Sequence, residues 1–489
     1  MGERLSERGN FWLHLDHPCN PMVVTGLIET VEPMSISELR RIIEKRLLIF
    51  NQFRKKLIKP SFTSQRFNWH IDPHFDIHSH VKRIALPKPG NKQSLQQVIN
   101  HHISTPMDKS KPLWDILLIE QYNNGSAIIA RFHLCIIGSV DFVRVLLSMS
   151  DDIYERLNNQ TVANQSKGLS ILPFPSIFEQ GLTVVNKTKE LGLSCLKIFF
   201  NSISNPFYII EIMRTSFGLS VEAAIELSRL ILLPVDSHTI FKGSPGVQKH
   251  VAWSEPIPLK RIKTVAYGAS ATVNVLLLTA MTGALKKYLL SRNSPIDYRE
   301  LRVAIPVDVR PHGIDPNKRS RFGVVLLDLP VHVEDPFVRL LEIKRRMSDM
   351  EQSPDVISIV HTLNSFGLSP KMIAQWIALH IPEKISAILS NAQGPDHEVL
   401  FGGKTIRRIM FWLPRTGRLT LGTTFCSYNG MISLGVAADA EQIPDPENII
   451  KQFNQQIDDI LEKIPQTIMN KNIMNRTSDN SLPDKKHDD

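Results

Sequence analysis

Segments with strand and helix patterns alternate along the first third of the chain, and this alternation most restricts the possible folds. The clearest strand is an apolar, β-prone run that follows the turn-forming stretch Asn123-Asn124-Gly125-Ser126. The predicted strands are residues 20–31, 116–120 and 127–134, and the predicted helices are residues 35–49, a helix ending at 98–103, and residues 142–149. Alternating elements of this kind fold into layers, with helices packed on a sheet. The sequence therefore predicts an α/β protein.

The size and composition are those of a folded protein with two domains. The chain has 489 residues, of which 42% are hydrophobic and 21% are charged. The four cysteines lie far apart and form no CxxC pair; they are Cys19, Cys135, Cys195 and Cys426. This spacing argues against a disulfide scaffold and against a cysteine-rich zinc site, and it fits a reducing, cytosolic compartment.

The chain is basic, with a formal net charge of +9 and a pI near 9.2. Such a charge suits nucleic acid, an anionic membrane surface or the phosphates of coenzyme A. The basic residues form scattered pairs and triplets such as Arg54-Lys55-Lys56 and Lys344-Arg345-Arg346. Short groups of this kind are typical of solvated helix faces, and no nucleic-acid module accompanies them. We therefore expect no nucleic-acid partner, and an anionic membrane surface remains a candidate partner.

The sequence contains no pattern of a signal peptide or a membrane span. The charged N-terminal stretch, residues 1–8, precedes no apolar core of the kind that signal peptides have. No stretch reaches about 18 uninterrupted apolar residues, the length that a spanning helix needs. We therefore expect a cytoplasmic protein.

Short sequence blocks follow one another from the first twenty residues to about residue 465. They are Leu5-Ser6 with residues 11–15, residues 20–27, residues 72–76, Pro112-Leu113-Trp114-Asp115, residues 252–259, Ala271-Thr272-Val273-Asn274, Val307-Asp308-Val309-Arg310, residues 390–395 and Ser427-Tyr428-Asn429-Gly430. Each block is weak alone, but all of them stand in one collinear order. By these blocks the chain resembles the bacterial and plant wax ester synthase/acyl-CoA:diacylglycerol acyltransferase (WS/DGAT) family.

The resemblance implies a particular architecture. Two α/β domains related by pseudo-twofold symmetry, as in chloramphenicol acetyltransferase and peptide-synthetase condensation domains, would enclose a substrate tunnel. The expected division is an N-terminal domain at residues 1–155, a helical linker at 156–250, a C-terminal domain at 251–465 and a disordered polar tail at 466–489. Strands of the second domain are expected at residues 301–309 and 323–333. The apolar helices of the linker either pack on the domains or lie in a membrane interface.

The catalytic signature of the resembled family is degenerate in this chain. The family signature is His-His-x-x-x-Asp-Gly, and its second His is taken to be the general base that deprotonates the acceptor alcohol. In this chain the four fixed positions are His133, Leu134, Gly138 and Ser139. The base is therefore replaced by leucine, and the aspartate that is thought to brace the loop through an arginine is replaced by glycine. A second family motif, Asn-Asp, reads Asn274-Val275 here and has lost its acidic member.

Other residues are expected to bind substrate because they match family motifs. These residues are Pro112, Leu113, Trp114, Arg310, Asn391, Gly394 and Pro395. No bound cofactor and no metal are expected, because acyl-CoA serves as a co-substrate. The expected partners are fatty acyl-CoA, diacylglycerol or a fatty alcohol, and a membrane surface or lipid inclusion on which the protein would lie peripherally.

Two residues of the degenerate signature could replace the missing base. Adjacent side chains on a strand point to opposite faces, so His133 would face away from the position of Leu134 unless the strand breaks at residue 133. Without that break, His133 would be a structural histidine. Cys135 would share the face of His133, which suggests a Cys/His nucleophile. The competing interpretation is a small buried residue, since free cysteine is among the most buried residue types.

Further histidines form patterns that imitate functional sites. His101-His102 is the one His-His pair, but Asp108 is six residues beyond His102, which does not fit the signature spacing. Another group, His70, His74, His78 and His80, has spacings that could belong to metal ligands, yet no strand or helix register would bring all four together. We therefore predict that neither group is a catalytic or metal site.

The sequence leads to two main functional hypotheses. One is an acyl-CoA-dependent O-acyltransferase of neutral-lipid synthesis, which gives triacylglycerol or wax ester and is weakened because Leu134 occupies the base position. The alternative is a catalytically inactive relative that binds acyl-CoA or lipid, or that partners an intact paralogue. A third hypothesis is acyl transfer to a specialised hydroxyl acceptor. The sequence does not choose among the acceptors.

Overall fold

The computed structural model describes residues 3–58, 67–137, 141–152, 154, 233–294, 296, 299–308, 322–351, 380 and 382–479. Most of the predicted linker, together with Gly138, Ser139 and Arg310, therefore lies outside the described residues. The described strands and helices form two layered halves, and the predicted α/β class is confirmed. The pseudo-twofold symmetry and the tunnel stay predictions.

The N-terminal half is built on a six-stranded sheet in the order β13-β14-β2-β7-β6-β5. The strands are β13 (Leu400–Phe401), β14 (Lys404–Trp412), β2 (Val23–Thr30), β7 (Gly125–His133), β6 (Trp114–Tyr122) and β5 (Val81–Arg83). Its helices are α1 (Glu7–Leu15), α2 (Ile36–Arg46), α3 (Ile77–His80), α4 (Lys92–Ile103) and α5 (Asp141–Ser148). A small sheet of β1 (Glu3–Arg4), β4 (Asn68–Ile71) and β3 (Lys55–Ile58) lies beside it. The predicted strands and helices of this half are confirmed in place.

Local chemistry explains where several of these elements begin and end. The Ser35 hydroxyl accepts a hydrogen bond from the Glu38 N–H, and the Glu38 carboxylate accepts one from the Ser35 N–H, so a capping box starts α2. Asn123 and Asn124 both have positive φ angles, of 51° and 65°, between β6 and β7. Asparagine tolerates that backbone region better than most residues, which explains the tight turn at this point.

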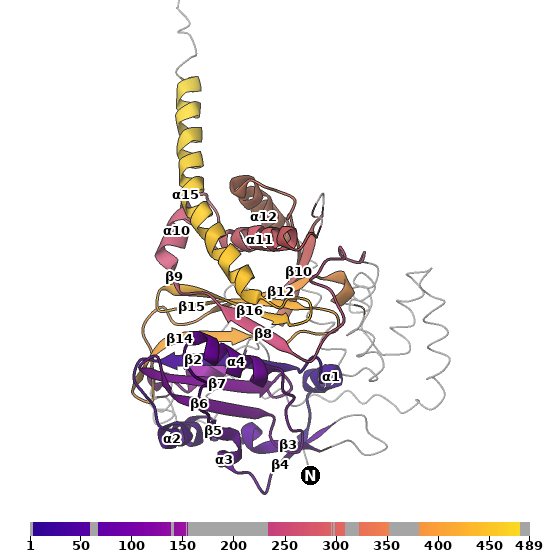
Figure 1. Ribbon diagram of the computed structural model, residues 1–489, viewed down its shortest axis with the longest axis vertical. Coiled ribbons are helices and arrows are strands. Elements are labelled where there is room, and N and C mark those ends of the chain that lie inside the picture. The colour runs from indigo at the N-terminus through magenta and orange to yellow at the C-terminus, as the bar shows by residue number, and fades with distance from the viewer. Residues whose placement is uncertain are drawn as a thin grey trace, which may run out of the picture.

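The C-terminal half is built on a seven-stranded sheet in the order β11-β10-β12-β15-β16-β8, with β9 also paired to β16. The strands are β11 (Phe322–Leu329), β10 (Leu301–Asp308), β12 (Ala387–Gln393), β15 (Leu421–Tyr428), β16 (Met431–Asp439), β8 (Lys249–Trp253) and β9 (Ile257–Pro258). The helices are α10 (Leu259–Gly268), α11 (Val273–Ser291), α12 (Pro336–Glu351) and α15 (Pro446–Asp479), and they gather on the side of this sheet that faces away from the N-terminal half (Figure 1).

A strand from the C-terminal half completes the sheet of the N-terminal half. β14 pairs with β2 in antiparallel register, with Trp412 opposite Thr25. The indole of Trp412 also contacts that of Trp253 on β8, with ring centroids 5.7 Å apart. The hydroxyl of Tyr428 on β15 donates to the Ile406 carbonyl on β14 at 2.9 Å. The two sheets therefore do not follow the predicted sequence boundary at residue 251, because pairing between distant segments overrides chain order.

The described part of the chain holds one helix, α11, that is long and apolar enough to cross a membrane. Its residues from Val275 to Ala284 are buried on all sides by α10, α12, α15 and the sheet. Burial of this kind is typical of a central core helix, which explains its composition without a membrane.

The C-terminal helix extends further than the sequence indicates. α15 ends at Asp479, so residues 466–479, predicted to be part of a disordered polar tail, are helical in the structure. A helix that is already nucleated by packing of its first turns can propagate through polar residues, since each added residue forms one more backbone hydrogen bond. Residues 480–489 lie outside the described residues.

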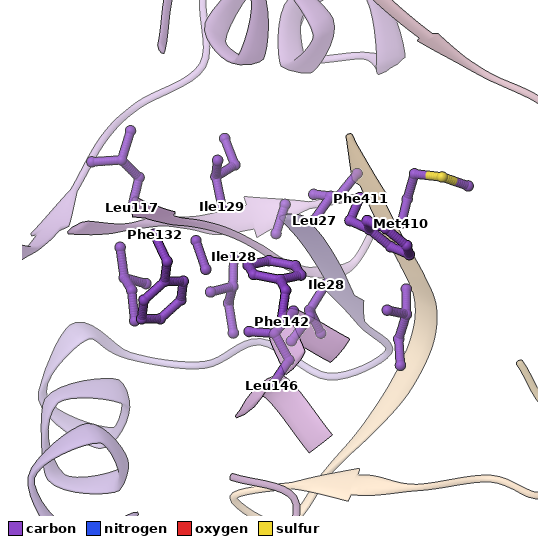
Figure 2. Packing of buried hydrophobic residues seen from close by; sticks show 14 of the residues in the cluster. Leu27, Ile28, Leu117, Ile128, Ile129, Phe132, Phe142, Leu146, Met410 and Phe411 are labelled. Carbon is purple, nitrogen blue, oxygen red and sulfur yellow. The ribbon is translucent and has the colours of Figure 1, made fainter. Parts of the chain in front are cut away.

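Helix α5 packs against the N-terminal sheet at a glycine. Figure 2 shows the Phe142 ring on the same side of the sheet as Ile28, Ile128 and Phe132. Gly26 of β2 lies beneath that ring, and a Cβ atom at this position would stand 2.4 Å from Phe142 Cζ. Phe142 is fully buried, so the ring has little room to retreat.

We predict that Gly26→Ala lowers the free energy of unfolding by about 1–3 kcal/mol, as overpacking in a core usually does. Combining it with Phe142→Leu should recover part of the loss, because the smaller side chain makes room for the new methyl group. Gly268→Ala is the control, since no atom lies within 4 Å of its added Cβ. Urea unfolding measures all three proteins, and equal midpoints for Gly26→Ala and Gly268→Ala would contradict the packing.

Candidate functional site

Strand β7 ends where the degenerate signature begins. The His133 N–H donates to the Leu113 carbonyl at 3.0 Å, which is the last bond of the sheet, and the Leu134 N–H donates to the Met22 carbonyl at 2.9 Å. The Ile136 N–H then donates back to the His133 carbonyl at 3.0 Å, so the chain turns at once. His133 is therefore still a paired residue of β7, and the chain leaves the strand just after this residue.

The side chain of His133 is nevertheless committed to the protein interior. It is 1% exposed, and its Nδ1 accepts a hydrogen bond from the Cys135 N–H at 3.1 Å. Its Nε2 lies 3.5 Å from Oδ1 of Asp16, which follows α1. Because Nδ1 acts as an acceptor, the neutral ring carries its proton on Nε2. Nδ1 is therefore occupied, whereas Nε2 faces Asp16 but is buried without a hydrogen-bond partner. The near-complete burial of the ring favours a structural histidine.

Asp16 anchors this turn through several contacts. Its carboxylate accepts a hydrogen bond from the Met22 N–H at 2.9 Å and pairs with Lys109 Nζ at 2.6 Å. Burial alone would raise the pKa of Asp16, but contacts with His133, Lys109 and the Met22 N–H lower that pKa well below its usual range. A charged carboxylate therefore holds His133, Met22 and Lys109 around the start of the signature.

The predicted general-base position contains no titratable group. Leu134 is 4% exposed and belongs to the main apolar core of the N-terminal half, together with Phe132, Ile137 and Phe142. Its peptide N–H holds the turn to Met22, which any residue other than proline can do. Leucine is therefore compatible with the local fold, and its side chain offers no atom that could accept a proton. The positions of Gly138 and Ser139 lie outside the described residues.

Cys135 does not supply a nucleophile in place of the base. Burial raises the pKa of its thiol well above the usual value, and the nearby charge of Asp16 raises the same pKa further. The reactive form of cysteine is the thiolate, which this environment disfavours. Cys135 instead packs with Leu5, Leu13 and Leu113 in a small apolar cluster.

The predicted substrate-binding residues Pro112, Leu113 and Trp114 lie in the interior of the N-terminal half. The Trp114 Nε1–H donates to the Phe53 carbonyl at 2.7 Å, and its ring stacks on His80 with centroids 4.6 Å apart. The described surroundings of these three residues are therefore those of core residues.

A buried polar network beside them was missed by the sequence analysis. The Arg131 guanidinium donates from Nε and Nη2 to both carboxylate oxygens of Asp115, at 3.0 and 2.5 Å. Nε2 of His102 lies 2.9 Å from Asp115 Oδ1, and Arg131 Nη1 donates to the Thr105 carbonyl at 2.7 Å. His102 therefore has a buried carboxylate partner. The signal available in the sequence was Arg131 itself, a charge inside an otherwise apolar strand.

Burial and the contacts within this network have opposite effects on the pKa values of Asp115 and His102. Burial would raise the pKa of Asp115, but hydrogen bonds from His102 and Arg131 lower it well below its usual range. Burial lowers the pKa of His102, and Asp115 only partly opposes that shift. A charged Asp115–Arg131 pair with a neutral His102 is therefore the stable state at neutral pH.

Four further predicted site residues lie in the C-terminal half: Asn274, Asn391, Gly394 and Pro395. Asn391, in β12, donates from Nδ2 to Oδ1 of Asn274, in the first turn of α11. The N–H of Gly394 donates to the Ser427 carbonyl at 2.8 Å, and the carbonyl of Pro395 accepts from the Asn429 N–H at 2.9 Å. A Cβ atom on Gly394 would lie 2.5 Å from the Ser427 carbonyl oxygen, so this close approach requires glycine. Among the described residues, no group of three or more His, Cys, Asp and Glu could hold a metal ion.

We predict that Asp115→Asn lowers the free energy of unfolding at pH 7 by about 2 kcal/mol or more, because it leaves Arg131 buried without its counter-charge. The folded-state pKa of Asp115 is lowered. Its contribution is therefore fully present above the unfolded pKa of about 3.9 and is lost as the pH falls below that value. The difference between wild type and variant should consequently shrink between pH 6 and pH 3 in denaturant titrations.

Asp108→Asn is the matched control for this measurement. Asp108 is an exposed carboxylate that pairs with Lys111 at 3.8 Å and accepts hydrogen bonds from the N–H and the hydroxyl of Ser110, which asparagine could also accept. Exposed pairs of this kind contribute about 0–1 kcal/mol. A loss of stability for Asp108→Asn as large as for Asp115→Asn would show that burial of the network is not the cause.

Comparison with known proteins gives matches over nearly the whole chain. Residues 5–277 match the profile of the wax ester synthase/diacylglycerol acyltransferase catalytic domain, and residues 320–461 match that of the WS/DGAT C-terminal domain. The chain is 25% identical over 480 residues to the probable diacylglycerol O-acyltransferase tgs2 of Mycobacterium tuberculosis, covering 93% of this chain and 98% of that protein. It is 23% identical over 413 residues to the probable diacylglycerol O-acyltransferase tgs1 of the same organism, covering 82% and 83%.

Solved structures resemble the fold. The wax ester synthase/diacylglycerol acyltransferase of Marinobacter aquaeolei VT8 matches with a TM-score of 0.64 at 18% identity, over 95% of this chain and 100% of that chain. The first condensation domain of the calcium-dependent antibiotic synthetase matches with a TM-score of 0.57 at 11% identity, over 95% and 96%. At these identities the likeness concerns the fold alone.

Proposed function

Because this chain belongs to the wax ester synthase/diacylglycerol acyltransferase family, we propose that it is an acyl-CoA-dependent O-acyltransferase of neutral-lipid synthesis with a weakened chemical step. The acceptor would be diacylglycerol or a long-chain alcohol. The acceptor oxygen attacks the thioester carbonyl, an ester C–O bond forms, the C–S bond breaks, and the hydroxyl proton ends on the sulfur of coenzyme A. The observation that carries the proposal is the buried Leu134 at the position where an imidazole would otherwise accept this proton.

The absence of a general base should lower the rate of the chemical step by a large factor. A general base typically contributes about 10²- to 10⁴-fold to a rate, while holding two reactants in place contributes a comparable or larger factor. A thioester is already an activated acyl donor, so positioning alone supports slow transfer. His133 does not restore the lost factor, because its Nδ1 accepts from Cys135 and its Nε2 faces Asp16.

We predict that the purified protein transfers labelled palmitate from palmitoyl-CoA to hexadecanol or diacylglycerol at least about 10²-fold more slowly than a relative with an intact signature. His133→Asn should leave this slow rate nearly unchanged, because asparagine retains an acceptor for the Cys135 N–H and lacks an imidazole. Thin-layer separation of labelled esters measures both rates. Full-rate turnover that His133→Asn abolishes would show that His133 is the working base.

Restoring the base gives a complementary test. Leu134→His alone supplies an imidazole without support from a neighbour, and an unsupported catalytic group is poorly oriented. We therefore expect more ester from Leu134→His combined with Gly138→Asp than from Leu134→His alone. No ester from the wild type, from either variant, or with any acceptor of a panel of alcohols would favour the alternative function of a non-catalytic acyl-CoA or lipid binder.

We also propose peripheral attachment to an anionic membrane or a lipid inclusion. The predicted linker helices lie outside the described residues, but exposed residues of α10 support the proposal. Lys260, Arg261 and Lys263 of this helix are exposed, and Tyr267 on its next turn is 87% exposed. Basic side chains next to an exposed aromatic ring are typical of surfaces that bind anionic lipid headgroups.

We predict that binding to vesicles containing anionic lipid falls as salt rises, and that Lys260→Gln with Lys263→Gln weakens it about 10-fold or more. Each basic residue near such a surface contributes about 1 kcal/mol, which is about fivefold. Lys45→Gln with Lys82→Gln is the control, because it removes the same charge from exposed positions of the N-terminal half. Co-sedimentation measures the affinity, and equal weakening by both pairs would argue against a specific α10 surface.

A further inference from the structure

Arg415 brings an unpaired positive charge between the two sheets. It lies in the connection from β14 to β15, just beyond Trp412, the last residue that pairs with β2. Its side chain is 5% exposed, and two of its guanidinium nitrogens, Nε and Nη1, are buried without a hydrogen-bond partner. Burial lowers the pKa of Arg415 to about 10, so the group is still charged at neutral pH.

The carboxylate of Asp439 is the counter-charge for Arg415, but it already accepts hydrogen bonds from other groups. Asp439, at the end of β16, is 1% exposed and accepts hydrogen bonds at Oδ2 from Lys249 Nζ at 2.6 Å and from the Gly246 N–H at 3.0 Å. Its Oδ1 accepts from the Glu441 N–H at 3.1 Å. Burial lowers the pKa of Lys249, and the charge of Arg415 lowers it further. Two buried cations therefore share one carboxylate, and this part of the interior has an excess of one positive charge.

The sheet beneath Arg415 presents a further unused polar group. Gly422 of β15 lies under the arginine, because a Cβ atom added to this glycine would stand 3.6 Å from Arg415 Cγ. Thr420 immediately precedes β15 and extends its pairing with β16, because the Asp439 N–H donates to the Thr420 carbonyl at 2.8 Å. Side chains two residues apart in such an extended segment share a face, so Thr420 lies on the same face as Gly422. The Thr420 hydroxyl is buried without a partner, and Thr420 is the cross-strand neighbour of Asp439. Free donors from Arg415 and Thr420 therefore lie over one end of β15.

The connection that carries Arg415 is fixed in place. Nδ2 of Asn20, in the segment before β2, donates to the Gly417 carbonyl at 2.9 Å. Leu419 forms an isolated bridge with Lys242. Contacts from both halves of the molecule hold the loop, so the arginine does not gain a partner simply by swinging outward.

We propose that Arg415, with Thr420 and the neighbouring charge of Lys249, forms a binding site for one oxyanion between the two sheets. The ligand is a carboxylate or a phosphate group. Guanidinium matches the geometry and charge of these groups, and it is weakly hydrated enough to be used in buried positions. An uncompensated buried charge is unfavourable, whereas a charged hydrogen-bond acceptor would satisfy both free nitrogens. Anion binding at this site does not depend on acyl transfer.

The test is calorimetric binding to the full-length protein at constant ionic strength, with three separate probes: inorganic phosphate, octanoate and coenzyme A. Wild type is compared with Arg415→Met and with Arg418→Met. Arg418 is the matched control, because it lies on the same connection but is half exposed and its one ion pair, with Glu383, is 3.6 Å long. We expect Arg415→Met to weaken binding of at least one probe by about tenfold or more, which corresponds to about 1.4 kcal/mol, and Arg418→Met to leave it unchanged.

The probes distinguish the source of the oxyanion. Binding of phosphate and coenzyme A without octanoate supports a phosphate ligand, and binding of octanoate alone supports the carboxylate of a fatty acid. Arg415→Met should remain folded, because replacing a buried unpaired charge by an apolar side chain is often neutral or stabilising; thermal unfolding without added anion confirms this. Absence of binding by the wild type, or equal affinity of wild type and Arg415→Met for every probe, overturns the proposal.

Discussion

The pairing of β14 with β2 is the interaction on which the rest of the structure depends. Through it, residues 404–412 become part of a sheet whose other long strands lie before residue 134. The two halves therefore share backbone hydrogen bonds as well as a surface. The same pairing places the loop of Arg415 beside the segment before β2, and it brings Trp412 against Trp253. The pairing of β14 with β2 therefore positions both the tryptophan contact and the Arg415 connection between the sheets.

The chemical loss in the signature has left the scaffold intact for a simple physical reason. The turn after β7 is held by backbone bonds at His133 and Leu134 and by the Asp16 carboxylate, none of which needs an imidazole at residue 134. A leucine side chain at that position is moreover well suited to the apolar core that surrounds it. The fold at this turn therefore does not require a proton acceptor at residue 134.

Local pattern predicted much of the fold. The β-prone runs around residues 20–31 and 127–134, and the capped helix at Ser35, lie where the sequence placed them. Interactions between distant residues could not be predicted from the local sequence pattern. Nothing in the run 404–412 indicates which strand it will join, and the orientation of His133 depends on Asp16, more than a hundred positions earlier. The helix through Asp479 was missed because polar composition was taken as disorder, although a helix needs only one packed end to continue.

The pairing of β2 with the distant strand β14 also has a consequence for the synthesis of this protein. During synthesis β2 emerges from the ribosome early, but its partner β14 follows only after nearly four hundred further residues. Until then β2 has one unpaired edge, and exposed edges of apolar strands invite pairing with other chains. Contacts between such distant residues also slow folding, because the entropy of closing a long loop is lost before the stabilising hydrogen bonds can form. The N-terminal sheet therefore cannot be completed until the second half of the chain has been synthesised. The yield of folded protein in a cell should depend on chaperones that cover the open edge of β2 while translation continues.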